Sequence, residues 1–88
     1  MLERDIEHHL VRRVRGLGGL CLKFVSPGLA GVPDRIVLLP GGGVAFVELK
    51  RPGQRPGPLQ LHMLAKLRQL GCRAAWFESK AEIDAFLA

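Results

Sequence analysis

The stretch that decides the fold runs from Val32 to Lys50 and reads VPDRIVLLPGGGVAFVELK. It contains two short apolar runs, residues 35–39 and 44–49, which are rich in β-branched and bulky side chains. Pro40 and the glycines that follow it separate the two runs, which is typical of the loop of a β-hairpin. We therefore predict two antiparallel strands joined by a short turn.

The length of the loop decides which side chains face each other across this hairpin. A loop of two or four residues would place Asp34 opposite Leu49, whereas a loop of three or five residues centred on Gly41 places Asp34 opposite Glu48. Because side chains alternate along a strand, Lys50 then shares a face with Glu48, about 7 Å further on. The second register brings two carboxylates and an ammonium group to one end of the hairpin.

Two carboxylates that face each other across a hairpin repel, because their Cβ atoms are only about 5 Å apart. A divalent cation would relieve that repulsion, and Mg²⁺ or Mn²⁺ prefers carboxylate and carbonyl oxygens. Asp34, Glu48 and the backbone carbonyl of Leu49 offer such ligands, and Lys50 would orient a bound water or stabilise charge on a phosphorus atom. The ordinary alternatives are a Pro-Asp turn and a solvated ion pair.

Length and composition limit the class of protein. A chain of 88 residues is expected to form one domain, residues 1–88. Its 13 Lys and Arg residues outnumber its 8 Asp and Glu residues, and the resulting charge of +5 suits a polyanionic partner. The hydrophobic share of 48% is high for so small a chain, so we expect leftover apolar surface to be buried in a homodimer.

Several other classes of protein lack support in this sequence. No apolar stretch is long enough to span a membrane and no signal peptide is recognised, so we expect an intracellular protein without a membrane partner. Cys21 and Cys72 lack the spacing of zinc ligands and are interpreted as small core residues. We interpret His8, His9 and His62 as solvated helix residues. The chain has neither a P-loop nor a dinucleotide fingerprint, so we expect no nucleotide cofactor.

The segments before the hairpin predict a helix and a strand. Apolar residues recur at helical spacing from Leu2 to Leu17, and the two glycines that follow end the helix. Residues 20–25 have the composition of a strand. The glycine-containing loop over residues 26–31 either lets a nucleic-acid strand approach closely or is an ordinary surface turn.

The segments after the hairpin predict a helix, a strand and a last helix. The first of these helices begins at Pro58 and is expected to bury a stripe made of Leu59, Met63, Leu67 and Leu70. Residues 73–77 form a strand, and Ser79 with Glu82 caps the last helix. The order α-β-β-β-α-β-α indicates an α/β fold, a mixed sheet flanked by helices whose last strand lies parallel to its neighbour.

Two features near the second helix have more than one interpretation. Gln60 occupies the third position of that helix, where it either caps the helix start or projects toward Asp34 and Glu48. Residues 51–57 form a basic segment rich in proline and glycine, which is either a solvated connector or a clamp on phosphate groups through its arginines.

Three short motifs together resemble those of the PD-(D/E)xK nucleases, and most closely those of the stand-alone VRR-Nuc domains of phages and prophages. They are Gly31-Val32-Pro33-Asp34, Val47-Glu48-Leu49-Lys50 and Pro58-Leu59-Gln60. The resemblance covers nearly the whole chain and implies a restriction-endonuclease-like core. It also implies that Asp34 and Glu48 bind Mg²⁺ or Mn²⁺, that Lys50 is the catalytic lysine, and that Gln60 supports the site.

Members of this family also have a glutamate on the first helix that completes the acidic cluster. Glu3 best fits the family's opening pattern, and Glu7, one helical turn later on the same face, is the alternative. Both residues also have an ordinary interpretation, since acids are favoured in the first turn of a helix by its dipole.

The resemblance implies a metal-dependent, structure-selective DNA endonuclease that acts as a homodimer on branched DNA, such as Holliday junctions, in the cytoplasm of a bacterial or phage-infected cell. The candidates for DNA contacts are Lys23, Ser26, Arg35, Arg51 and Arg55. Two alternatives stay open. One is a general nicking or flap-repair nuclease, and the other is a basic nucleic-acid-binding module without catalytic activity.

Overall fold

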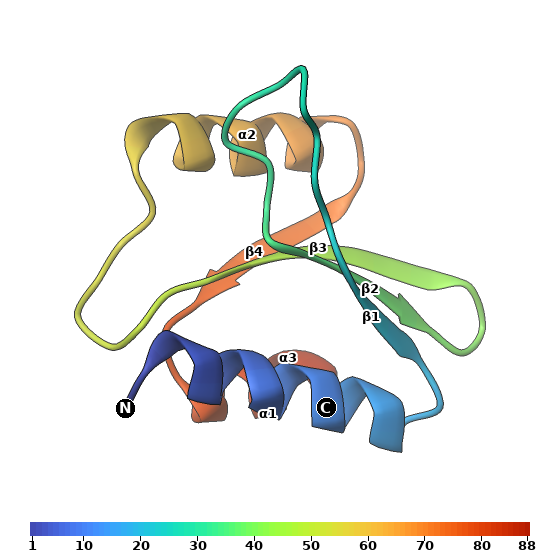
Figure 1. Cartoon of the computed structure of the whole chain (residues 1–88). Helices are drawn as coiled ribbons and strands as arrows, with labels where there is room; N and C mark the ends of the chain where they lie inside the picture. Colours follow the sequence, from blue (N-terminus) through green and yellow to red (C-terminus); the bar gives the residue numbers. More distant parts are fainter.

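The computed structural model describes residues 1–88 and contains one four-stranded sheet with three helices (Figure 1). In chain order the elements are α1 (Glu3–Gly16), β1 (Leu20–Lys23), β2 (Arg35–Leu39), β3 (Gly43–Leu49), α2 (Pro58–Gln69), β4 (Arg73–Phe77) and α3 (Lys80–Leu87). This α-β-β-β-α-β-α order confirms the order predicted from the sequence. No helix of this structure is both long and apolar enough to span a membrane.

The sheet has the strand order β1-β2-β3-β4 and is mixed. β1 pairs antiparallel with β2, and β2 pairs antiparallel with β3. The chain then crosses over through α2 and adds β4 parallel to β3, which confirms the predicted parallel strand.

The register of the β2–β3 hairpin distinguishes the two alternatives that the sequence left open. Ile36 pairs with Phe46 and Leu39 pairs with Gly43, so residues 40–42 form the loop. Gly41 at the centre of this loop has a φ of +86°, a conformation that side-chain-bearing residues rarely adopt. The three-residue loop centred on Gly41 is therefore confirmed, and its register places Asp34, just before β2, opposite Glu48.

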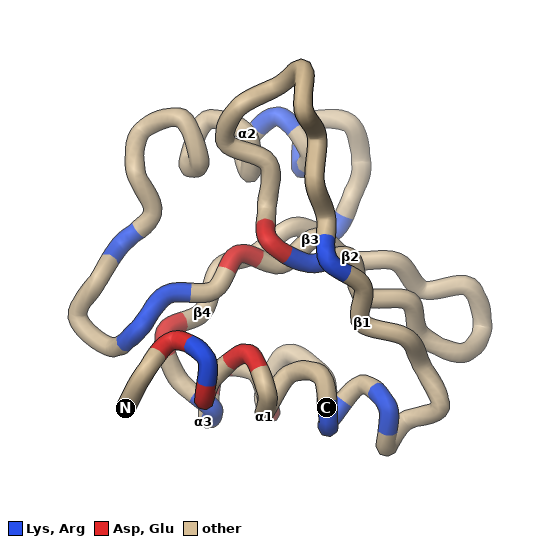
Figure 2. Tube along the Cα trace, in the orientation of Figure 1, with Lys and Arg blue, Asp and Glu red and all other residues tan.

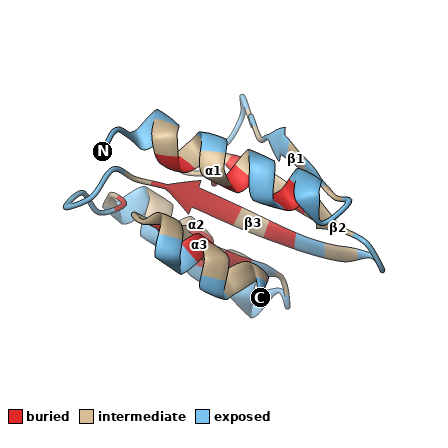
Figure 3. Ribbon diagram, turned by 90° about the horizontal axis from the view of Figure 1, so that it is seen from below, coloured by how far each residue is buried: buried red, intermediate tan, exposed pale blue.

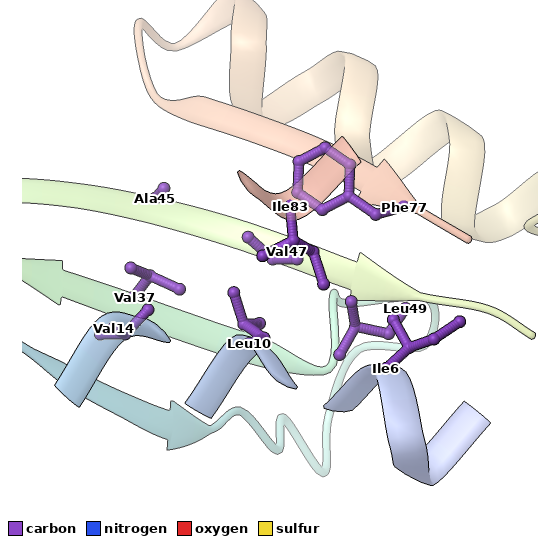
Figure 4. Close-up of a cluster of buried hydrophobic side chains, with 9 residues drawn as sticks. All are labelled: Ile6, Leu10, Val14, Val37, Ala45, Val47, Leu49, Phe77 and Ile83. Atoms are coloured by element: carbon purple, nitrogen blue, oxygen red, sulfur yellow. The ribbon is translucent and has the colours of Figure 1, made fainter. Parts of the chain in front are cut away.

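The main hydrophobic core lies between the sheet and the pair of helices α1 and α3, which run side by side across one face of the sheet (Figures 1 and 3). Alternate residues of β2 and β3 point to this face because side chains alternate along a strand. The nine buried members of the core, drawn in Figure 4, are Ile6, Leu10, Val14, Val37, Ala45, Val47, Leu49, Phe77 and Ile83.

Helix α2 lies on the opposite face of the sheet and packs against β4. Its buried residue is Leu64, with Met63 and Leu67 half-buried beside it. The predicted stripe is therefore wrong at its ends, since Leu59 is 64% and Leu70 is 69% exposed. The physical reason is that α2 packs mainly along the edge strand β4, so it buries a narrow stripe shifted around the helix.

Polar contacts fix the last helix in place. Ser79 Oγ accepts a hydrogen bond from the Glu82 backbone N–H at 3.2 Å, which confirms the predicted cap. Asp84 of α3 lies 2.8 Å from His9 Nε2 and 3.0 Å from Arg13 Nε of α1. The hydrogen bond to His9 lowers the pKa of the Asp84 carboxyl. The interpretation of His9 as a solvated residue is therefore wrong, because it joins α1 to α3.

Candidate active site

Asp34 is held where the chain enters β2, directly after the buried Pro33. Its backbone carbonyl accepts a hydrogen bond from the Phe24 N–H at 2.9 Å, which aligns this segment with the end of β1. Its side-chain oxygen Oδ2 accepts a hydrogen bond from the Leu49 N–H at 3.1 Å. The carboxylate therefore faces the end of β3 that carries Glu48.

Glu48 is a buried carboxylate on the α2 side of the sheet, with 1% of its surface exposed. Its Oε2 atom lies 3.4 Å from Lys50 Nζ and accepts a hydrogen bond of 2.9 Å from Gln60 Nε2. Its other oxygen, Oε1, is buried and has no hydrogen-bond partner. A buried carboxylate oxygen without a donor is costly, so this atom is the unusual feature of the site.

The electrostatics of Glu48 follow from this environment. Burial, and after it the nearby Asp34 carboxylate, raise the pKa of Glu48 from its ordinary 4.5 to about 7, while Lys50 acts in the opposite direction. Lys50 alone therefore does not compensate for the two carboxylates. A pair of carboxylates with one oxygen lacking a donor is a donor set that fits a hard divalent cation.

Gln60 performs both roles that the sequence left open. Its Oε1 atom accepts a hydrogen bond of 2.9 Å from the Gly57 N–H, which caps the start of α2. Its Nε2 group donates to Glu48, as described above. The Gln60 side chain thus caps the start of α2 and orients the Glu48 carboxylate. These two hydrogen bonds link the position of α2 to that of Glu48.

The acidic residues of α1 do not join this group. Glu7 Oε2 lies 3.3 Å from Arg35 Nη2, and Glu3 is exposed at the helix start. In the tube of Figure 2 the acidic positions of α1 lie apart from those at the start of β2 and the end of β3. The structure contains no group of three or more His, Cys, Asp or Glu side chains that could hold a metal ion. A role for Glu3 or Glu7 at the site therefore stays a prediction.

Lys and Arg positions are spread over several elements and loops (Figure 2), and the candidates for DNA contacts lie in different parts of the chain. Lys23 and Arg51 are exposed, and Ser26 is half-buried in the loop before β2. The guanidinium of Arg55 lies over the Trp76 ring, 5.9 Å from its centre. The structure places Arg35 on the α1 side of the sheet, where it is buried. Their contacts with DNA stay predictions.

Two contacts escaped the sequence analysis. The Arg35–Glu7 ion pair joins residues far apart in the chain, and no local pattern signals it. Arg35 also lies near Cys21, whose thiol has a pKa raised by burial and lowered in part by the neighbouring guanidinium. Both cysteines are free thiols, and Cys21 packs against the core as predicted.

Comparison with known proteins agrees with this fold. Residues 3–81 match the sequence profile of the VRR-NUC domain. Over 78 residues the chain is 51% identical to "Putative nuclease p44" of Acyrthosiphon pisum secondary endosymbiont phage 1. The aligned segment covers 89% of this chain and 84% of that protein. A solved structure described as a VRR_NUC domain has a TM-score of 0.91 and 31% identity, covering 97% of this chain and 92% of its own.

The fold and these relatives thus define a nuclease domain, and nucleic acid is the substrate that such a domain implies. The chain belongs to the VRR-NUC domain family, which confirms the resemblance inferred from its three motifs.

Proposed function

We propose that this VRR-NUC domain is a divalent-metal-dependent DNA endonuclease that hydrolyses phosphodiester bonds. The observation that carries the proposal is the buried Oε1 atom of Glu48, which receives no hydrogen bond. The carboxylate of Asp34 lies near Glu48 as the second acidic group of the site. A structural acidic pair would be expected to satisfy both oxygens with donors from the protein. A ligand site leaves one oxygen available for a cation.

Each residue of the site has a distinct task in this proposal. Asp34, Glu48 and the backbone carbonyl of Leu49 would hold Mg²⁺ or Mn²⁺. When bound, such an ion acidifies a coordinated water and neutralises charge on the phosphate. Lys50, which lies beside Glu48, would orient the attacking water or stabilise the charge that grows on the phosphate oxygens. Gln60 keeps Glu48 in one orientation through its hydrogen bond.

The exposed apolar surface of the sheet supports a homodimer. Helix α2 covers β4, whereas Leu20, Leu22 and Val44 on the same face are 57%, 45% and 43% exposed. A contiguous apolar face of this kind is typical of a surface that a partner covers. A second copy of the chain placed there would give an assembly with two sites related by a two-fold axis.

We further propose that the preferred substrate is branched DNA, with four-way junctions as the leading candidate. A two-fold dimer presents two sites to a two-fold branched substrate, so paired nicks become possible. The chain has no helix beyond those that build the core and the site, so selection by DNA shape is favoured over selection by sequence. Cleavage of a junction, a linear duplex and a flap of matched sequence would separate these alternatives.

The test of catalysis is nicking of supercoiled plasmid with Mg²⁺, with Mn²⁺ and with EDTA. We expect nicking only with a divalent ion, and we expect Glu48→Ala to abolish it while DNA binding persists. Glu82→Gln is the control, because it removes the charge of an exposed glutamate of α3, on the other face of the sheet, and keeps the side-chain oxygen that accepts hydrogen bonds from Glu78 N–H and Ser79 Oγ. Binding without nicking by the wild-type protein would favour the non-catalytic module instead.

A further inference from the structure

A polar cleft lies on the opposite face of the sheet from Glu48, between α1 and the edge formed by β1 and β2. It has a volume of about 420 Å³, and its lining includes Glu7, Arg12, Arg15, Cys21 and Arg35. None of these residues belongs to the group formed by Asp34, Glu48, Lys50 and Gln60. The cleft is therefore separate from the candidate active site and needs its own explanation.

The charges of the cleft favour an anionic ligand. Three guanidinium groups line it, whereas Glu7 is its only carboxylate, and His8 adds a further positive charge when it is protonated. Arg12 and Arg15 are three residues apart on α1, so their side chains lie on the same face of the helix. Arg13, which lies between them in sequence, instead pairs with Asp84 of α3. The cleft thus contains two arginines of α1, Arg12 and Arg15, that form no ion pair within the protein.

Arg35 shows that the cleft is more than an array of surface charges. It is 9% exposed, and its Nη2 atom pairs with Glu7 at 3.3 Å while Nη1 donates to the Cys21 carbonyl at a long 3.4 Å. Its Nε–H is buried and has no acceptor. Because both Nη groups already have partners in the protein, the Nε–H is the donor of Arg35 that is left for a phosphate oxygen.

We propose that this cleft binds a backbone phosphate of the nucleic-acid substrate, remote from the phosphate that is cleaved. Arg35 lies at its base and is positioned by Glu7, while Arg12 and Arg15 contact the phosphate from the α1 side. The inference rests on the proposed function in one respect, that the ligand is a nucleic acid. It assigns to α1 a role in holding the strand in addition to its role in the core.

The salt dependence of DNA binding tests this proposal. Each phosphate contact adds about 0.9 to the slope of log affinity against log salt concentration. We expect Arg12→Ala and Arg15→Ala each to weaken binding of a fluorescein-labelled duplex in EDTA and to reduce the slope by about that amount. Arg4→Ala is the matched control, because it removes the same charge from an exposed position of α1 outside the cleft.

Equal losses of DNA affinity in Arg4→Ala and Arg15→Ala would overturn the proposal, because they would indicate diffuse electrostatic attraction by the whole helix. Unchanged slopes for both cleft variants would overturn it as well. Melting temperatures of all variants, measured without DNA, separate binding effects from unfolding. Plasmid nicking by the wild-type protein is scored independently. A protein that does not nick but shows the expected slopes would contradict the proposed catalysis and leave the cleft assignment standing.

A direct readout comes from the Nε–H group of Arg35 in a ¹H–¹⁵N spectrum. We expect its resonance to shift during titration with a short DNA duplex in EDTA, and we expect Arg15→Ala to reduce that shift at the same DNA concentration. Arg35→Lys removes the signal and thereby assigns it. A resonance that stays in place while backbone signals near Lys50 shift would show that DNA binds without entering the cleft.

Discussion

At the scale of single residues, Glu48 shows how a fold changes the chemistry of a common side chain. A Glu-x-Lys sequence on an open strand is usually a weak, solvated ion pair. Here burial, and after it the facing Asp34 carboxylate, raise the pKa of the glutamate to about 7, although Lys50 acts in the opposite direction. The groups that surround Glu48 come from separate segments of the chain, since Asp34 precedes β2, Lys50 follows β3 and Gln60 belongs to α2.

The raised pKa predicts how stability and metal binding depend on pH. Without metal, Glu48 in the folded protein keeps a proton that the unfolded chain loses above about pH 4.5, so its stabilising contribution is present below pH 4.5 and is lost as the pH rises through 7. A cation competes with that proton. We therefore expect Mn²⁺ to raise the melting temperature more at pH 8 than at pH 5.5. An equal rise at both values, or the same pH dependence in Glu48→Gln, would contradict this account.

A second prediction at this scale concerns the acidic residues of α1. The family resemblance gives Glu3 a role at the site, whereas Glu7 is engaged with Arg35. We expect Glu3→Gln to slow plasmid nicking by about 10- to 100-fold, the range typical for loss of a group that supports a metal site. Glu7→Gln should instead lower the melting temperature with a smaller effect on nicking, because it leaves the buried Arg35 without its partner. The opposite ranking of nicking rates would assign the role to Glu7.

At the scale of elements, the hairpin could be predicted well and α2 could not. The register followed from local information, since the glycines around Gly41 set the loop length and thereby placed Asp34 opposite Glu48. The buried stripe of α2 depends on which strand the helix covers, and that is decided by tertiary packing. The same limit applies to the Asp84 contacts and to the Arg35–Glu7 pair, whose partners are distant in sequence.

The corrected stripe of α2 can be tested by a pair of leucine substitutions. Leu64 is 1% exposed, so Leu64→Ala should lower the free energy of unfolding by about 2–5 kcal/mol. Leu59 has the same side chain on the same helix but is mostly exposed, so Leu59→Ala should change it by about 0.5 kcal/mol or less. Urea unfolding of both variants measures the difference. If Leu59→Ala lowered the free energy of unfolding more than Leu64→Ala, the stripe predicted from the sequence would be correct.

At the scale of the whole molecule, the two faces of the sheet have different partners. One face is closed by α1 and α3, and their contact with β2 and β3 forms the core. The other is covered by α2 over β4 only, so part of its apolar surface is exposed beside the candidate active site. The hydrophobic share of the sequence indicated leftover apolar surface, but its location on the sheet required the structure.

This uneven coverage predicts where the homodimer forms. Leu22→Asp places a charge in the uncovered sheet face and should convert the dimer to a monomer, measured as a halving of mass by light scattering from twice the 9.7 kDa of one chain. Leu70→Asp, at an exposed position at the end of α2, is the matched control and should leave the mass unchanged. A dimer that persists in Leu22→Asp would exclude this face, and a monomeric wild-type protein would exclude the dimer itself.

The central claim is that Asp34 and Glu48 form one cation site, and direct measurement of Mn²⁺ binding by electron paramagnetic resonance tests it most simply. The signal of free Mn²⁺ should fall when the wild-type protein is added at pH 8. Asp34→Asn and Glu48→Gln preserve the size of each side chain, and with either variant the signal of free Mn²⁺ should stay unchanged. With Glu82→Gln the signal should fall as it does with the wild-type protein. Mn²⁺ binding by Glu48→Gln with wild-type affinity would contradict the account.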